Sequence, residues 1–278
     1  MSKLSRAGCL LGIICGGLVL AAGCVTQIEE ASQESLLGPH KAGALFLESA
    51  KTDLLNLPCR IIEDSQDTFF RSDNILALLL AGGASIAMDQ SSTDRDIAEH
   101  LEDHAVFQGF ADEGLNVLGS PATHFVATGL WYAISAEKQY ELNEERAWTM
   151  MTALSVTGLV TAGLKGVRDN ETPNGKAWAW PSGHTSSSFT VASVLHEFYG
   201  LKVGIPAYAI ASLVAYRMMD AGDHWASDVV FGATLGWVVG HTVAAKHKKL
   251  EVAGFEILPY YAATRDGPAI GVSLVKQF

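Results

Sequence analysis

The chain has 278 residues, of which 49% are hydrophobic and 18% are charged. This length and composition allow one large domain with a buried core, and they are typical of a helical bundle or a membrane-associated protein. The net charge of −11 excludes nucleic acid as an expected partner, because no basic stripe is present to neutralise phosphates.

The first residues resemble an export signal. Lys3 and Arg6 form a positively charged start, and a short apolar run follows. The small residues before Cys24 are similar to those of a bacterial lipoprotein signal, in which the cysteine is acylated and becomes the mature N-terminus. The sequence therefore predicts a lipoprotein signal peptide over 1–23, lipidation at Cys24 and a polar tether over 24–45. An ordinary cleaved signal peptide or an uncleaved anchor is the alternative.

Acyl chains on Cys24 would hold the protein at a membrane surface. Val25 follows the cysteine, so no aspartate retention signal is present, and this favours the outer membrane. The expected location is the bacterial cell envelope, with the protein lipid-anchored and facing the periplasm. With Cys24 acylated, Cys59 has no partner, so no intramolecular disulfide is expected.

The middle of the chain is helical in pattern. Residues 46–110 are expected to form an N-terminal helical segment, and residues 111–249 a core bundle whose clearest helix covers 141–167. That helix contains eighteen consecutive uncharged residues, enough to invite a transmembrane interpretation. The other apolar runs, 203–216 and 229–245, are 14 and 17 residues long, which favours a globular bundle on a lipid tether over an integral membrane protein.

Residues 250–278 change character. Two β-prone runs, 255–261 and 270–275, are separated by a turn that contains Asp266, Gly267 and Pro268. We expect a β-hairpin at the edge of the bundle. The predicted fold class is therefore all-α, a helical bundle with a small C-terminal β-hairpin.

A Pro-Ser-Gly-His segment at 181–184 precedes an apolar-periodic run, which predicts a helix that starts near Thr185. Ser182 and Gly183 would then present backbone N–H groups to an anion at the helix N-terminus. His184 would lie beside that anion, where it could protonate a leaving oxygen.

A second group of residues suits phosphate chemistry. His224 and Asp228 are four residues apart, so on a helix they lie on one face, and the carboxylate would orient the imidazole as a nucleophile. Lys165 and Arg217 could supply the positive field that a phosphoryl group requires. Taken alone, a His–Asp pair at this spacing is more often a surface pair, and Lys165 can be read as ordinary helix-dipole compensation.

Together these motifs resemble the signature of the type 2 phosphatidic acid phosphatase superfamily, which includes bacterial acid phosphatases, lipid phosphatases and vanadium haloperoxidases. Lys165 stands at the opening lysine of that pattern, and 181–184 match without change. Arg217, His224 and Asp228 correspond to the third motif. The resemblance covers roughly residues 115–249 and implies the helical bundle of that superfamily.

Two departures from the pattern matter. Thr172 stands where an arginine is expected, which removes a bidentate phosphate clamp, and Arg168 or Lys176 is the candidate to compensate. Tyr216 replaces a serine, and six residues rather than five separate Arg217 from the histidine. One extra residue turns a helix by about 100°, so it must lie in a loop if the arginine is to reach the anion.

The resemblance implies a metal-independent phosphatase that hydrolyses phosphomonoesters or lipid-linked phosphates through a phosphohistidine. His224 would be the nucleophile, Asp228 would orient it, and His184 would protonate the departing alcohol. The phosphate oxygens would be held by cations and by helix N–H groups: Lys165, Arg217, Ser182 and Gly183.

The expected partners are a phosphorylated small molecule or lipid and, through the lipid anchor, the membrane; the oligomeric state is open. No cofactor and no metal are expected, since His100, His104 and His124 form no ligand spacing. The alternatives are a vanadate-dependent haloperoxidase, with vanadate held by His224, and a catalytically degenerate envelope lipoprotein of the same fold.

Overall fold

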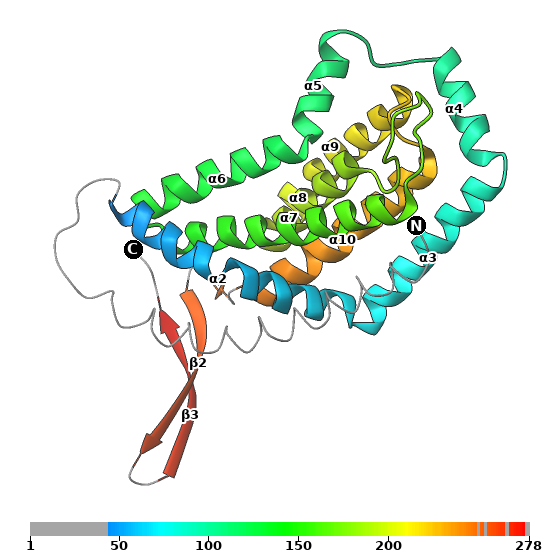
Figure 1. Ribbon diagram of the computed structural model, residues 1–278. Helices are drawn as coiled ribbons and strands as arrows, with labels where there is room; N and C mark the ends of the chain where they lie inside the picture. The colour runs from blue at the N-terminus through cyan, green and yellow to red at the C-terminus, as the bar shows by residue number, and fades with distance from the viewer. Residues whose placement is uncertain (1–43, 249–250, 253–254, 265–266, 276–278) are drawn as a thin grey trace.

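The computed structural model describes residues 44–248, 251–252, 255–264 and 267–275 (Figure 1). The predicted signal peptide, Cys24 and all but the end of the predicted tether lie outside the described residues. The helices are α2 (Ala44–Phe69), α3 (Ser72–Gln90), α4 (Thr93–Asp103), α5 (Phe110–Gly119), α6 (Pro121–Glu137), α7 (Glu141–Arg168), α8 (Gly183–Tyr199), α9 (Leu201–Asp220) and α10 (Ala226–His247).

The bundle is built around α10, which packs most extensively against α8 and also contacts α3 and α7 (Figure 1). The core between these helices contains Leu154, Val194, Leu235 and Val239, all almost fully buried. Burial of each such side chain stabilises the fold by roughly 1.5–3 kcal/mol. α2 and α3 pack along α10, so these N-terminal helices contribute to the bundle.

A stripe of glycines brings α10 into direct contact with the backbone of α8. Gly232, Gly236 and Gly240 are four residues apart and therefore lie on one face of α10. A Cβ atom at Gly236 would lie 2.1 Å from the carbonyl oxygen of Ser186, and one at Gly240 would lie 2.7 Å from that of Thr190. Only glycine permits this approach, which joins the helices that carry the two histidine motifs.

The start and end of α8 are determined by local chemistry. Ser182 is the N-cap, and its side-chain oxygen accepts the backbone N–H of Thr185 at 3.4 Å. The helix therefore begins at Gly183, slightly before the predicted start near Thr185. It ends at Tyr199, and the residue that follows, Gly200, has a φ of 70°, a conformation that favours glycine.

Two helices, α7 and α10, are long and apolar enough to cross a membrane, and the bent pair α3 and α4 would form a third such span if taken together. The apolar run over 229–245 is shorter than the helix that contains it, because α10 has 22 residues. Large apolar side chains are also more than half exposed on three other helices: Leu76, Leu79 and Leu80 on α3, Val126, Leu130 and Ile134 on α6, and Leu201 and Ile205 on α9. Exposed apolar surface of this extent is typical of a protein that contacts lipid.

The C-terminal strands are β1 (Glu251–Val252), β2 (Phe255–Thr264) and β3 (Gly267–Val275). β2 pairs antiparallel with both β1 and β3. We expected a hairpin at the edge of the bundle, and this placement was wrong. Among the described residues the strands contact only one another, and they project away from the helices (Figure 1). The helical bundle alone therefore positions the candidate site.

The expectation that Cys59 has no partner was also wrong. Cys59, on α2, is disulfide-bonded. The sequence argument had assumed that Cys24 is acylated. That residue and the other two cysteines, Cys9 and Cys15, lie outside the described residues.

Candidate active site

His224 and Asp228 meet at the N-terminus of α10. His224 lies in the loop before the helix, and its Nδ1 is 3.3 Å from Oδ2 of Asp228. The same carboxylate oxygen accepts the backbone N–H of Trp225 at 2.9 Å. The pair thus forms across the start of the helix, not along its face as the spacing alone suggested. Because Nδ1 faces the carboxylate, Nε2 is the nitrogen available to a substrate.

The two histidine motifs are joined by a backbone hydrogen bond. The N–H of Ser182 donates to the carbonyl oxygen of Asp228 at 3.2 Å, which fixes the first turn of α8 against the first turn of α10. Ser182 was predicted to offer this N–H to a phosphate, and that prediction was wrong because the bond to Asp228 uses it. Gly183 and His184 follow in the first turn of α8, where backbone N–H groups have no intrahelical acceptor.

His184 lies close to the other charged groups of the site. Its pKa is lowered to about 4, mainly by burial and also by positive charge on His224 and Arg217, while the negative charge of Asp223 opposes the shift. The charges of His224 and Arg217 therefore act on the imidazole of His184. In the resting protein at neutral pH, His184 is therefore uncharged.

Arg217 is held by two carboxylates. Its Nε donates to Asp112 at 2.6 Å and its Nη1 to Asp223 at 2.5 Å, and its side chain is almost fully buried. Asn116, on α5 like Asp112, lies 3.5 Å from Nη1. The sequence predicted a cation free to bind phosphate, whereas here its charge is neutralised. Burial alone would raise the pKa of Asp223, but hydrogen bonds from Lys176, Asn174 and Arg217 outweigh burial and lower it.

The loop after α9 separates Arg217 from His224. α9 ends at Asp220 and α10 begins at Ala226, so the segment between the two residues includes a non-helical stretch, 221–223, which can accommodate an extra residue. Gly222 in this loop has a φ of 66°, and its N–H donates to the carbonyl of Met219 at 2.9 Å. The tight turn directs both Arg217 and His224 towards the same end of the bundle.

Thr172, which replaces the expected arginine, shapes a turn. Its hydroxyl donates to Oδ1 of Asn174 at 2.6 Å and accepts the backbone N–H of Lys176 at 3.0 Å. The turn places Nζ of Lys176 2.8 Å from Asp223, at the exposed edge of the arginine network. Arg168 instead forms an ion pair with Asp89 at 2.9 Å. Of the two cations considered for compensation, Lys176 is thus the one that reaches this network.

Lys165 lies in the last turn of α7. Its Nζ donates to the carbonyl oxygens of Trp178 and, at 3.1 Å, Ala179, in the loop that precedes the Pro-Ser-Gly-His segment. It also lies close enough to Asp228 to experience that negative charge. Lys165 therefore joins the end of α7 to the loop that leads into α8.

Sequence reasoning missed two residues that lie around the site. His124, on α6, is half-buried, and burial lowers its pKa to about 4, while the carbonyl of Leu118 opposes the shift. Its charge would be felt by His184. Asp94, on α4, is also missed, although it accepts both the N–H and the hydroxyl of Ser227 in the first turn of α10. No local sequence pattern identifies these two residues, because the residues that they contact are distant in the sequence.

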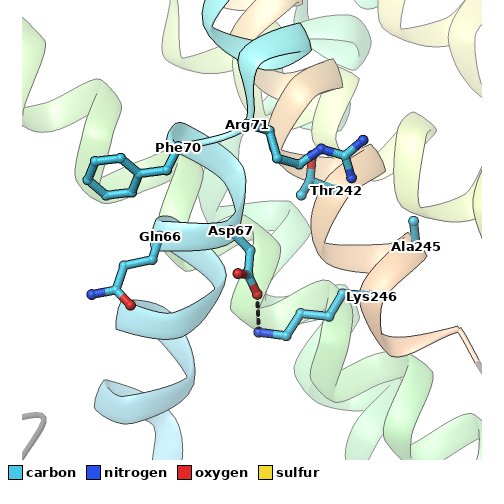
Figure 2. Close-up of a pocket in the computed structure, with 7 residues that line it drawn as sticks. All are labelled: Gln66, Asp67, Phe70, Arg71, Thr242, Ala245 and Lys246. Atoms are coloured by element: carbon cyan, nitrogen blue, oxygen red, sulfur yellow. Dashed lines mark ion pairs between the residues drawn. The ribbon is translucent and has the colours of Figure 1, made fainter.

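Within the described ranges, no group of three or more His, Cys, Asp or Glu side chains is placed to hold a metal ion. A pocket of about 470 Å³ lies near the other end of α10 (Figure 2). Lys246 in that pocket is bound by Asp67 at 2.6 Å and Asp64 at 3.1 Å. Asp228 and Lys246 are separated by about 27 Å along the helix, so this pocket is distinct from the histidine site.

The chain matches known proteins over the segment that contains these motifs. Residues 164–251 match the family model of the PAP2 superfamily. A lipid A 1-phosphatase of Porphyromonas gingivalis is 34% identical over 86 residues, which are 30% of this chain and 19% of that protein. A lipid A 4'-phosphatase of Helicobacter pylori is 29% identical over 68 residues, 24% of this chain and 34% of that protein. The chain thus spans about a fifth and a third of these relatives' lengths.

Two solved structures are similar in fold. A transmembrane PAP2 type phosphatidylglycerolphosphate phosphatase from Bacillus subtilis has a TM-score of 0.53 and 20% identity, over 62% of this chain and 94% of that one. LpxE from Aquifex aeolicus has a TM-score of 0.47 and 19% identity, over 56% of this chain and 97% of that one. Residues 164–251 are thus similar to the PAP2 superfamily, and the chain shares the fold of the Bacillus subtilis protein.

Proposed function

We propose that this protein is a metal-independent phosphatase that hydrolyses lipid-linked phosphates through a phosphohistidine at His224. The observation that carries the proposal is the junction of α8 and α10. There the bond between Ser182 and Asp228 joins the segment that bears His184 to the oriented His224–Asp228 pair. Two imidazoles on either side of one phosphoryl group provide a nucleophile and a proton donor.

The reaction proceeds in two displacements. Nε2 of His224 attacks phosphorus while the P–O bond to the alcohol breaks, and His184 gives its proton to the departing oxygen. Because His184 is neutral in the resting protein, this proton arrives with a monoanionic substrate or is taken up when a bound phosphate raises its pKa. Water then attacks the phosphohistidine, His184 accepts a proton from it, and orthophosphate leaves.

The non-bridging oxygens of the phosphate are stabilised by Lys165, by the N–H of Gly183 and by Arg217. Lys165 is held by two carbonyl groups of the loop that leads into the Pro-Ser-Gly-His segment. Arg217 contributes only when the phosphate displaces one of its two carboxylates. Binding of the substrate therefore exchanges an ion pair of Arg217, either with Asp112 on α5 or with Asp223 in the loop before α10.

A lipid substrate is supported by two features. Both curated relatives are named as lipid A phosphatases. In addition, α7 and α10 are apolar enough to cross a membrane, and α3, α6 and α9 expose large apolar side chains. We place the protein at a membrane of the bacterial envelope, with its site facing the periplasm. The lipid anchor at Cys24 and the outer membrane as its location are part of this proposal.

One observation favours a different candidate, a protein of this fold without turnover. Thr172 supplies no cation where the family has arginine, and the remaining arginine is neutralised. Such a protein would bind a phosphorylated lipid without cleaving it. The two candidates differ in whether orthophosphate is released.

The test is hydrolysis of p-nitrophenyl phosphate and of phosphatidic acid in detergent, with a chelator present. We expect the wild type to release orthophosphate and the His224→Ala variant to release none. His241→Ala, near the other end of α10, is the matched control and should retain full activity. Full turnover by the His224→Ala variant would exclude the phosphohistidine. No turnover by the wild type on either substrate would support the binding protein.

A further inference from the structure

Three buried polar atoms around the two histidines have no hydrogen-bond partner. They are Oδ1 of Asp228, Oγ of Ser188 and Nδ1 of His124, and they make up three of the five such atoms among the described residues. Buried polar atoms in folded proteins are nearly always paired, because an unpaired one loses its bonds to water without replacement. Three of them near one site indicate that a bound molecule completes their bonds.

Ser188 lies on the face of α8 that carries His184. The two residues are four apart on the helix, so their side chains are neighbours, and Ser188 is only 5% exposed. Ser187 donates its hydroxyl to the carbonyl of Gly119 at 3.3 Å, which brings the corner between α5 and α6 against this part of α8. Ser188 thus extends the site one helical turn beyond His184.

His124 reaches the same region from α6. It lies five residues after Gly119, the residue that contacts α8. That corner is closely packed, since a Cβ at Gly119 would lie 2.2 Å from Cγ1 of Val214 on α9. His124 is near enough for its charge to act on His184. Neither His124 nor Ser188 has a role in the proposed phosphoryl transfer.

The chemistry of the two side chains indicates the kind of group they would bind. The imidazole of His124 already interacts with the backbone carbonyl of Leu118, so its unpaired Nδ1 remains to bond a ligand, and the hydroxyl of Ser188 can donate and accept. Neither carries a positive charge, so the pair suits a hydroxyl or amide group rather than a second anion. A site that hydrogen-bonds such a group discriminates against substrates that lack it, because its own polar atoms then stay unpaired.

We propose that His124 and Ser188 form a subsite beside His184 that binds a hydroxyl or amide group of the substrate headgroup next to the scissile phosphate. The protein then prefers phosphates carried on hydroxylated headgroups, such as sugars, over simple alkyl phosphates. This inference rests on the proposed phosphatase function and specifies its substrate class.

The test compares two detergent-soluble substrates, octyl phosphate and octyl glucoside 6-phosphate. Both are phosphate esters of a primary alcohol with the same alkyl chain, and only the second has hydroxyl groups next to the phosphate. For His124→Leu and for Ser188→Ala we expect kcat/KM on the glucoside to fall about tenfold, and kcat/KM on octyl phosphate to change less than about twofold. His124→Gln retains a donor and an acceptor and should restore most of the preference.

The control is His196→Gln, because His196 also lies on α8 and also has an unpaired buried Nδ1, but it lies far from His184 along the helix. It should leave the ratio of the two kcat/KM values unchanged. Equal losses on both substrates, or no loss on either, would overturn the subsite while leaving the phosphatase in place. A wild type that hydrolyses neither substrate would overturn the phosphatase and the subsite with it.

Discussion

The packing of α8 on α10 can be tested by a substitution that adds one methyl group between the two helices. In a Gly236→Ala variant the new Cβ would lie 2.1 Å from the carbonyl oxygen of Ser186 and 2.9 Å from the backbone nitrogen of Thr190. Both neighbours are backbone atoms, so no side-chain rotation relieves the overlap. An ordinary contact begins at 3.4 Å, so the helices must move apart by 1.3 Å at this point.

This displacement should affect both stability and activity. Overpacking of a core costs about 1–3 kcal/mol, and we expect the upper end of that range because the clash is with backbone. The same movement separates His184 on α8 from His224 before α10, and a displacement of about 1 Å in a catalytic site lowers the rate about 100-fold. Urea unfolding followed by circular dichroism, together with hydrolysis of p-nitrophenyl phosphate, measures the two effects.

Gly163→Ala on α7 is the matched control. Nothing lies within 4 Å of a Cβ at that position, so the substitution should stabilise the protein by about 0.4–1 kcal/mol and leave activity unchanged. If the Gly236→Ala variant were as stable and as active as this control, the close approach of α8 and α10 would not assemble the site.

Two further predictions concern charge. The pKa values of His124 and His184 are about 4 in the folded protein against 6.5 in the unfolded chain, so the unfolded chain binds more protons between these values. Stability is thus complete above about pH 6.5 and falls as the solution is acidified, by roughly 1–2 kcal/mol per histidine at pH 5. Urea unfolding at pH 7 and pH 5 checks this, and an equal free energy of unfolding at both would contradict it. In an Asp112→Asn variant, Arg217 loses one of the two carboxylates that neutralise it. Orthophosphate should then inhibit the enzyme several-fold more tightly, which its inhibition constant measures. An unchanged inhibition constant would show that Arg217 does not bind the phosphate.

Local patterns were sufficient for the helices and motifs of the core. The predicted helix over 141–167 corresponds to α7, and the Pro-Ser-Gly-His segment begins α8, because apolar periodicity and an N-cap serine act within a few residues. The glycines at 232, 236 and 240 were visible at a spacing of four. That pattern could have predicted the close contact with α8.

The partners of Arg217 could not be read from the sequence. Asp112 is 105 residues away, and its carboxylate looks like an ordinary first-turn residue of an amphipathic helix. The same holds for His124, whose significance depends on the corner between α5 and α6 meeting α8. Pairings at such separations follow from the packing of whole helices, which a single sequence does not encode locally.

The neutralisation of Arg217 affects how strongly the site attracts an anionic substrate. Arg217 and Lys176 are balanced by Asp112 and Asp223, and Lys165 lies close to Asp228, so this cluster of six groups has no net charge. A neutral entrance exerts little long-range attraction on dissolved anions, and free orthophosphate is not concentrated there. Affinity must then come from short-range contacts with the rest of the substrate, so the tail and headgroup, more than the phosphate, decide which molecules are held.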